Sequence, residues 1–227
     1  GKGAGPLDVK QAVDRQSPPG LRESVELAES ASRLLAVRDT AGAKAAAEKA
    51  VALHPANIRA LWALYQANAL RKDYPAALAA VEKALVYDGT NTNLLNAKSN
   101  ILSRLGRYQD ALVIADTVLA DSPGDASALF NKSFALSGLG RREEALTFLR
   151  QAAQRESRYL PFYERAAAMS PDADLVSLFT GEAAAAKPAA KEPAHKFRWM
   201  AVAGGVLAGL LLIVLGVSSG GTLVTSI

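Results

Sequence analysis

Apolar and small residues recur along the first 180 residues of the chain with two superimposed periods. Within segments of about 13 to 16 residues they keep the three-to-four spacing of one helix face. The whole pattern then repeats every 34 residues, and Asn68 is the one polar residue among the positions that define it. These positions are Ala43, Ala77, Ala111 and Ala145; Leu27, Leu61, Leu95 and Leu129; Leu34, Asn68, Leu102 and Leu136; and Ala50, Ala84, Val118 and Ala152.

Each 34-residue unit contains two helix-spaced apolar stripes separated by a short turn. Gly106 and Gly140 stand in two of these turns, and Pro55 and Pro123 stand where units end. Glycine and proline interrupt helices, so each unit is predicted to be a helical hairpin. The expected helix pairs are residues 21–37 and 41–53, 57–70 and 74–87, 91–105 and 108–120, and 125–139 and 142–155.

A 34-residue helical hairpin with this pattern resembles the tetratricopeptide repeat (TPR), whose units stack because one hairpin cannot bury its own apolar face. Ala43, Ala77, Ala111 and Ala145 match the most characteristic alanine of that family. Other positions agree less completely. Ala50, Ala84 and Ala152 match a second alanine of the family, and Val118 departs from it. The family has an aromatic residue after the turn. Tyr74 and Tyr108 match it, whereas Thr40 and Arg142 do not.

After the fourth unit, residues 159–169 continue in register with a fifth first helix, and residues 172–179 supply at most one short turn of helix. This is typical of a capping helix. The expected fold is therefore all-α: four TPR-like hairpins and a cap, followed by a single transmembrane helix. The expected boundaries are a flexible leader (1–20), the array (21–180), an Ala, Pro and Lys tether (181–198), a membrane span (199–217) and a short tail (218–227).

The predicted span is the uncharged run WMAVAGGVLAGLLLIVLGV, 19 residues at positions 199–217. At about 1.5 Å per residue it approaches the roughly 30 Å of a bilayer's hydrocarbon. Basic residues precede it and no charged residue follows, so the positive-inside rule places the repeats in the cytoplasm and the tail across the membrane. These basic residues are Lys187, Lys191, Lys196 and Arg198.

Small residues are spaced four apart within the span, at Ala201, Gly205 and Gly209. This spacing lets two membrane helices approach closely, so a helix partner in the bilayer is one hypothesis and a plain anchor is the other.

Composition argues against several functions. The chain has no cysteine, two histidines and a formal charge of +4. His54 and His195 lie at a repeat boundary and in the tether, and no phosphate-binding loop, nucleophile elbow or zinc-binding helix motif is present. The sequence therefore predicts no catalysis, no metal site and no cofactor. Without an arginine-rich or aromatic-interleaved stripe, nucleic-acid binding is not expected.

The resemblance implies that the concave face, formed by the first helix of each unit, carries the binding site. Asparagine amides there would hold an extended peptide backbone while aromatic residues supply apolar pockets. The alternative is that Trp62 and Phe134 pack between repeats and the asparagines are merely solvated. The candidate groove residues are Arg59, Trp62, Gln66, Asn93, Asn96, Asn100, Phe130, Asn131 and Phe134.

TPR domains that grip the C-terminal carboxylate of chaperones place lysine, asparagine and arginine at set positions of three repeats. Asn100 and Asn131 match the two asparagines, but Asn96 replaces the first lysine, Pro161 replaces the second, and Arg165 alone supplies a cation. An internal or uncharged peptide is the better expectation.

The expected function is a membrane-anchored scaffold that binds a partner protein or peptide in the groove. The alternative is a structural subunit or assembly factor of a membrane complex, with its span making the main contacts. A tail-anchored fission or import receptor shares the layout at the level of architecture alone.

Overall fold

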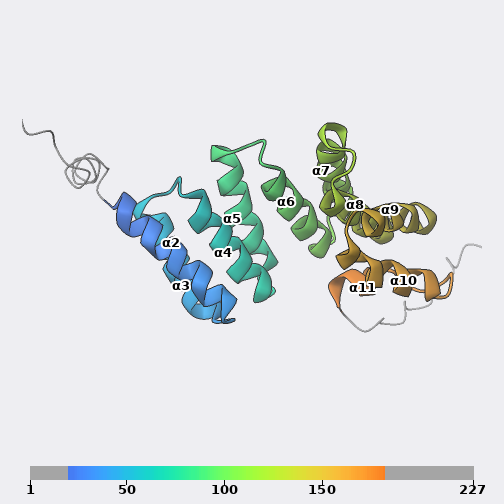
Figure 1. Ribbon diagram of the computed structural model, residues 1–227, viewed down its shortest axis with the longest axis horizontal. Coiled ribbons are helices and arrows are strands. Elements are labelled where there is room, and N and C mark those ends of the chain that lie inside the picture. The colour runs from blue at the N-terminus through green and yellow to red at the C-terminus, as the bar shows by residue number, and fades with distance from the viewer. Residues whose placement is uncertain (1–19, 182–227) are drawn as a thin grey trace, which may run out of the picture. The chain divides into compact units, whose positions relative to one another are not determined.

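The computed structural model describes residues 20–181, which form a row of antiparallel helices (Figure 1). The elements in chain order are α2 (Leu21–Ala36), α3 (Thr40–Leu53), α4 (Ile58–Leu70), α5 (Tyr74–Tyr87), α6 (Thr92–Arg104), α7 (Tyr108–Asp121), α8 (Ala126–Gly138), α9 (Arg142–Arg155), the 3₁₀ turn η1 (Ser157–Tyr159), α10 (Leu160–Ala168) and α11 (Val176–Thr180). The predicted hairpins are α2 with α3, α4 with α5, α6 with α7, and α8 with α9. All four are confirmed.

Side-chain caps fix the start of five of the ten α-helices in the described residues. An aspartate or asparagine accepts a hydrogen bond from a backbone N–H of the first turn, which satisfies a donor that the helix itself leaves unpaired. The capping residues are Asp39, Asn57, Asp73, Asn91 and Asp125. Helices α7 and α9 have no side-chain cap, and acidic residues in their first turns complement the helix dipole instead.

The turn inside each hairpin has the same hydrogen-bonding pattern in all four repeats. Arg38, Lys72, Gly106 and Gly140 have φ values of 61°, 60°, 76° and 75°, so each stands in the left-handed region. The next residue donates its N–H, at 2.9 Å, to the carbonyl five positions back. This is the Schellman arrangement, which normally takes glycine.

Helix packing is uneven along the array. Consecutive helices pack on each other, and the first helices of neighbouring repeats also meet at α2 with α4 and at α6 with α8. By contrast, α4 and α6 hardly meet, and the second and third repeats are joined mainly through α5 and α6. The concave side of the array is therefore open between α4 and α6.

The buried side chains of the core become larger along the chain, and so do the clusters that they form. At the N-terminal end the core consists of small clusters of alanines, such as Ala28, Ala50 and Ala60. Toward the C-terminal end one large cluster joins leucine, isoleucine and phenylalanine side chains from α5 to α11, with Phe134 fully buried within it. Alanine permits close helix approach but removes little apolar area from water, so the C-terminal repeats have the larger hydrophobic stabilisation per residue.

Two ion pairs repeat with the period of the fold. Lys98 of α6 contacts Glu82 of α5 at 3.0 Å, and Lys132 of α8 contacts Asp116 of α7 at 2.6 Å, with 34 residues between equivalent partners. Surface pairs contribute at most about 1 kcal/mol each, so they favour the register more than the overall stability.

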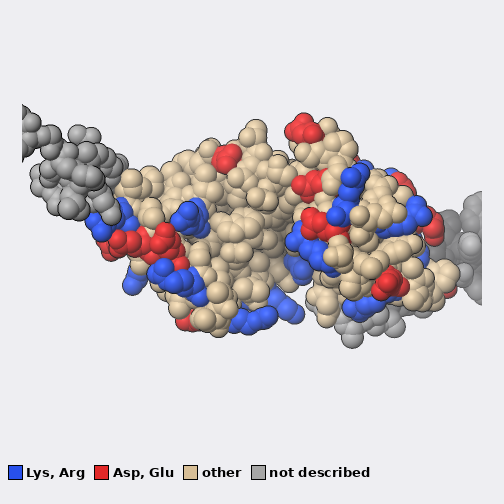
Figure 2. Space-filling model, viewed as in Figure 1, with Lys and Arg blue, Asp and Glu red and all other residues tan. Residues whose placement is uncertain are grey.

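Over α5 and its neighbours, one face of the array shows few charged side chains (Figure 2).

The cap differs in detail from the expectation. The helix predicted at residues 159–169 is split into the 3₁₀ turn η1 and α10, with Pro161 in the first turn of α10. The segment predicted at residues 172–179 contributes α11, five residues long, which packs against α8 and α10. Arg142 holds the connecting loop, because its guanidinium donates to the carbonyls of Ala173, Ala166 and Met169.

No helix within residues 20–181 is long and apolar enough to cross a membrane. The predicted span at residues 199–217, with Ala201, Gly205 and Gly209, lies outside the described residues, as do the tether and most of the leader.

Candidate functional site

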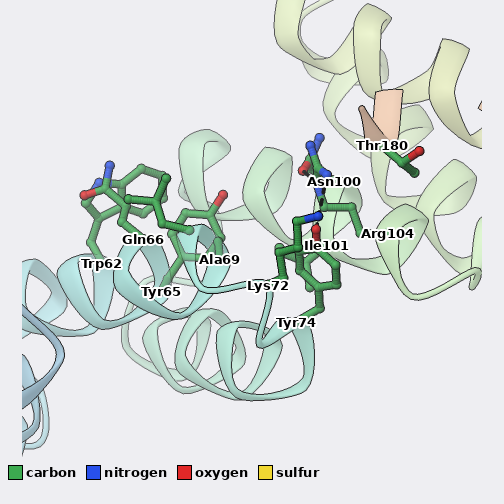
Figure 3. A pocket seen from close by; sticks show the side chains of 11 residues that line it. Trp62, Tyr65, Gln66, Ala69, Lys72, Tyr74, Asn100, Ile101, Arg104 and Thr180 are labelled. Atoms are coloured by element: carbon green, nitrogen blue, oxygen red, sulfur yellow. Dashed lines mark hydrogen bonds between the residues drawn. The ribbon is translucent and has the colours of Figure 1, made fainter. Parts of the chain in front are cut away.

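The open concave side between α4 and α6 holds a pocket of about 460 Å³ (Figure 3). The α4 wall is largely aromatic, with Trp62 and Tyr65, and the α6 wall is polar, with Asn100 and Arg104. The lining residues are Trp62, Tyr65, Gln66, Ala69, Leu70, Lys72, Tyr74, Asn100, Ile101, Arg104 and Thr180. The pocket lies where the backbones of the first helices of the second and third repeats stay apart, although Leu61 of α4 and Leu94 of α6 share one core cluster.

A second hollow of about 470 Å³ continues the groove toward the N-terminal ends of α4 and α6. It shares Trp62 with the first pocket, and Arg59 and Asn93 line it as well. Arg59 is exposed and pairs with Glu29 of α2 at 3.2 Å. Of the predicted groove residues, Arg59, Trp62, Gln66, Asn93 and Asn100 therefore line one continuous concave surface.

Arg104 organises the α6 wall. Its Nε donates to the Asn100 Oδ1 at 3.0 Å, its Nη1 to the Tyr74 hydroxyl at 3.4 Å, and its Nη2 to the backbone carbonyl of Phe179 at 3.3 Å. The guanidinium carbon also lies 5.6 Å from the centre of the Tyr74 ring, in cation–π range. These contacts fix the orientation of a positive charge at the edge of the pocket.

Lys72 brings a second positive charge to the pocket from the turn between α4 and α5. It is exposed, and its φ of 60° is one that glycine adopts at the equivalent positions of the next two repeats. A left-handed conformation costs a residue with a Cβ roughly 1 kcal/mol or more. Arg38 has the same conformation in the first repeat. No acidic residue lines this pocket, so its charge is positive.

Tyr65 is the second aromatic residue of α4 that lines the pocket. Its ring lies 4.9 Å from that of Trp62, and its side chain is partly buried. Burial raises the pKa of the Tyr65 hydroxyl above its ordinary value, and the nearby positive charge of Arg104 opposes this shift in part. Ser99 and Ser133 stand at the equivalent positions of the following repeats and bond to backbone carbonyls of their own hairpins. The large side chain at position 65 is thus specific to the repeat that forms the pocket.

The predicted asparagines bond mainly to each other. The Asn131 Nδ2 donates to the backbone carbonyl of Asn96 at 2.9 Å, and the Asn100 Nδ2 donates to the Asn131 Oδ1 at 3.2 Å. Asn96 in turn donates to the Asp125 carboxylate at 3.2 Å. Asn96 and Asn131 are 8% and 4% exposed. They tie α6 to α8, and Asn100 is the member of the set that lines the pocket.

The aromatic residues of α8 are covered by the cap. Phe134 is fully buried, and its ring stacks on that of Phe179 at 4.7 Å with 5° between the planes. Phe130 is half-buried, packed among Tyr159, Phe162 and Phe179. For Phe134, the structure favours the packing interpretation over the binding one. Neither Asn131 nor Phe134 lies open in the groove, because Asn131 is buried where α8 bonds to α6 and Phe134 is covered by α11.

Sequence reasoning missed Tyr65, Lys72, Tyr74, Arg104 and Thr180, which also line the pocket. One signal was available: Arg104 lies four residues after Asn100 and continues the same helix face. Thr180 had no such signal, since its place depends on how the cap folds back.

Within the described residues no cluster of three histidine, aspartate or glutamate side chains is arranged to hold a metal ion. Several carboxylates of the turn regions cap helices, and others pair with basic neighbours. Arg141, for instance, donates twice to Glu144, and this hydrogen bonding lowers the pKa of the Glu144 carboxyl.

The geometry defines an all-helical array of stacked hairpins with an open concave surface. Family models described as tetratricopeptide repeat match residues 29–92 and residues 102–159. The chain therefore carries tetratricopeptide repeats, as the sequence indicates. Neither matching model describes a catalytic family, and TPR-repeat scaffold proteins are generally non-enzymatic.

Several solved structures share the fold. A MamA fragment from Desulfovibrio magneticus RS-1 is 18% identical with a TM-score of 0.55, the match covering 73% of this chain and 92% of that one. YrrB, described as a TPR protein with an unusual peptide-binding site, is 19% identical with a TM-score of 0.54, covering 76% and 81%. A tetratricopeptide repeat protein from Parabacteroides merdae ATCC 43184 is 18% identical with a TM-score of 0.54, covering 70% and 61%.

At these identities the likeness establishes the fold alone. No curated protein sequence matches the chain.

Proposed function

We propose that this protein is a membrane-anchored scaffold that binds a partner protein through an extended peptide segment lying along α4 and α6. The observation that carries the proposal is the open concave surface between these helices, where neighbouring first helices elsewhere in the array pack together. Solvent-accessible aromatic and amide groups line it. TPR proteins bind protein or peptide partners, and YrrB is described as having a peptide-binding site.

The chemistry of the pocket narrows the kind of peptide. Trp62 and Tyr65 favour an apolar or aromatic side chain, and Gln66 offers an amide to a peptide backbone. Asn100 already bonds to Arg104 and Asn131, which leaves it one further N–H to donate. Lys72 and Arg104 favour a carboxylate. We therefore expect a segment in which a bulky apolar residue stands near an aspartate or glutamate. The sequence alone favoured an internal or uncharged peptide, because only one cation of the three in a carboxylate clamp is present.

The membrane part of the proposal rests on the sequence. The 19 uncharged residues at positions 199–217 follow a basic flank, which supports a single span with the repeats on the cytoplasmic side. The tether would then hold the repeats near the bilayer, where a soluble partner would be recruited.

The alternative function, a subunit or assembly factor of a membrane complex, is favoured by the small residues Ala201, Gly205 and Gly209, which suit contact with another membrane helix. In that case the span would make the main contacts, and the repeats would cover a partner's cytoplasmic surface.

Site-specific photocrosslinking distinguishes these functions. A photoreactive amino acid is placed at Gln66 in the pocket, at Val113 on an exposed outer surface, or at Gly205 in the span, and the full chain is irradiated in native membranes. The scaffold function predicts a defined soluble partner captured from Gln66 and not from Val113. Capture confined to Gly205 and integral proteins would support the subunit function instead.

Two matched variants test the charge of the pocket. Lys72→Gly removes a cation while giving the turn the residue that its φ favours, and Arg38→Gly makes the same change in the first repeat, outside the pocket. Neither change should destabilise the fold. Lys72→Gly should lower the yield of the Gln66 crosslink at least several-fold and Arg38→Gly should leave it unchanged. Equal effects of the two variants would contradict a charge-dependent site.

A further inference from the structure

The chain's own α11 lies on the concave side of the array, beside the pocket. Leu175, Leu178 and Phe179 are 4%, 7% and 5% exposed, and their spacing puts them on one face of a helical turn. Phe179 stacks on Phe134 and reaches Phe130, with ring centres 4.7 and 5.1 Å apart. The surface that α11 covers, formed by Phe130, Phe134 and Arg104, is called the α8 seat below.

The contacts of α11 resemble those of a bound peptide. An apolar turn with anchors at positions i, i+3 and i+4 lies in a groove, which is the usual way an amphipathic helix is recognised. The Arg104 side chain donates to the backbone carbonyl of Phe179, a contact that any residue in that place would provide. The seat therefore recognises a backbone carbonyl and a bulky apolar side chain, and neither requirement is specific to α11 itself.

Helix α11 keeps its helical form only through its contacts with the rest of the array. It is five residues long, far below the length at which an isolated helix is stable in water. It is held by its three apolar anchors, by Arg104, and by the Arg142 contacts to the preceding loop. Arg142 stands where the second and third repeats have Tyr74 and Tyr108, so this attachment is particular to the last repeat.

We propose that the α8 seat is a second binding subsite, occupied by α11 in this structure, which takes a partner segment in exchange for α11. This inference rests on the proposed scaffold function and extends its groove by one repeat. The occupant is a short helical segment with the pattern Leu-x-x-Leu-Phe, followed within a few residues by a carboxylate. The apolar part follows from what α11 buries.

The carboxylate follows from continuity with the pocket. Thr180, the last residue of α11, lines the same pocket as Lys72 and Arg104 (Figure 3). A chain that leaves the seat in the direction of α11 therefore enters a region with two cations and no acidic lining residue. A partner that fills both subsites would gain the apolar contacts of the seat and the charge of the pocket.

Competition with α11 should lower the apparent affinity of a partner segment for the α8 seat by a measurable factor. A tethered segment acts at an effective concentration on the order of millimolar, so a free peptide meets a seat that is mostly occupied. Its apparent affinity is reduced by the fraction of chains with an open seat. If α11 is docked in about nine chains of ten, releasing it strengthens peptide binding about tenfold.

The test uses a fluorescein-labelled synthetic peptide with the sequence of residues 173–182, ADLVSLFTGE, and the full chain in mild detergent, with empty micelles as the blank. Fluorescence anisotropy gives its affinity for the unaltered chain and for two variants that release α11 by different contacts. Phe179→Ala removes the main anchor, and Arg142→Ala removes the attachment of the loop. Both should bind the peptide about tenfold more tightly than the unaltered chain.

Two controls make the result specific. In the Phe179→Ala background, Arg104→Ala should weaken peptide binding several-fold, because it removes the donor to the peptide carbonyl, whereas Arg33→Ala on the exposed surface of α2 should not. A scrambled peptide should not bind. The proposal is overturned if the peptide binds the released and unaltered chains equally, if it binds none of them, or if Arg104→Ala and Arg33→Ala act alike.

Failure here and failure of the scaffold function give different results. A partner captured from Gln66 whose yield is the same in the unaltered and Phe179→Ala chains would leave the scaffold function in place and remove the second subsite. Loss of capture at Gln66 altogether would remove the scaffold function, whatever the peptide does.

Discussion

Asn68 is the one polar residue in a register position filled by leucine in the other three repeats. Its side chain is 2% exposed, and its Oδ1 has no hydrogen-bond partner. Leu102 and Leu136, its equivalents, are 1% exposed and belong to the large core cluster. Replacing Asn68 with leucine should therefore make the protein more stable.

The magnitude follows from two terms. A buried polar group without a partner costs about 1–3 kcal/mol, which the substitution removes. Asn68 borders a hollow of about 260 Å³ lined by alanine, valine and leucine together with Lys44, Glu48 and Lys83, and this hollow gives space for the larger side chain. Allowing for imperfect packing, we expect a gain of about 2 kcal/mol, which corresponds to roughly 4–8 °C in Tm for a domain of this size.

Thermal and urea unfolding followed by far-UV circular dichroism measure the change. Repeat arrays need not unfold in one step, so native-state hydrogen exchange of α4 and α5 should show whether the gain is local. The converse substitution, Leu102→Asn, is the matched control and should cost about 3 kcal/mol. An unchanged or lower stability of Asn68→Leu would refute the reasoning, since it would mean that the amide is satisfied or that the hollow does not accept leucine.

Three further predictions concern stability and ionisation. Asn131→Ala should lower the free energy of unfolding by about 1–3 kcal/mol, because it removes a buried hydrogen bond from α8 to α6. Asn100→Ala, at the pocket, should lower it by less than half as much. Urea titration compares the two variants, and equal losses would contradict the structural role of Asn131. Gly138→Ala should destabilise the chain by roughly 1–3 kcal/mol, because its new Cβ meets the Tyr108 ring. In a thermal melt of the double mutant, Tyr108→Leu should restore part of this loss, whereas additive losses would argue against the clash. The raised pKa of Tyr65 means that the folded state keeps its phenol proton more tightly, so the stability from this proton is full below pH 10 and is lost as the pH rises through the folded pKa. Burial raises the pKa of Tyr108 as well, so absorbance at 295 nm should show late-titrating phenols, and Tyr65→Phe should remove one of them. Removal of a phenol that titrates in the ordinary range would disprove it.

The repeats were predictable because their signals are local. Helix-spaced apolar stripes, a 34-residue period and turn residues fix each hairpin, and the capping residues lie in the sequence immediately before the helices that they begin. Asn57 and Asp73, for example, bond to the helix starting at the next residue. Contacts of this kind do not depend on the rest of the fold.

The candidate site was predictable in part, because it depends on contacts between distant elements. A uniform array would expose Asn131 and Phe134, but Asn131 bonds to α6 and α11 folds back over Phe134. The gap between α4 and α6 likewise arises from uneven packing of helices that follow the same pattern. Trp62, Gln66 and Asn100 line the pocket because they belong to the repeats on either side of this gap.

The unequal core has a consequence for biosynthesis. A ribosome releases the alanine-rich N-terminal hairpins first, and these bury the least apolar area. A helical hairpin with so small a core is marginal alone, since its stability comes mainly from its neighbours. We predict that the first two hairpins become protected from hydrogen exchange after the third and fourth in pulse-labelled refolding; protection in the opposite order would contradict this. The repeats made last would then act as the template on which those made first complete their folding.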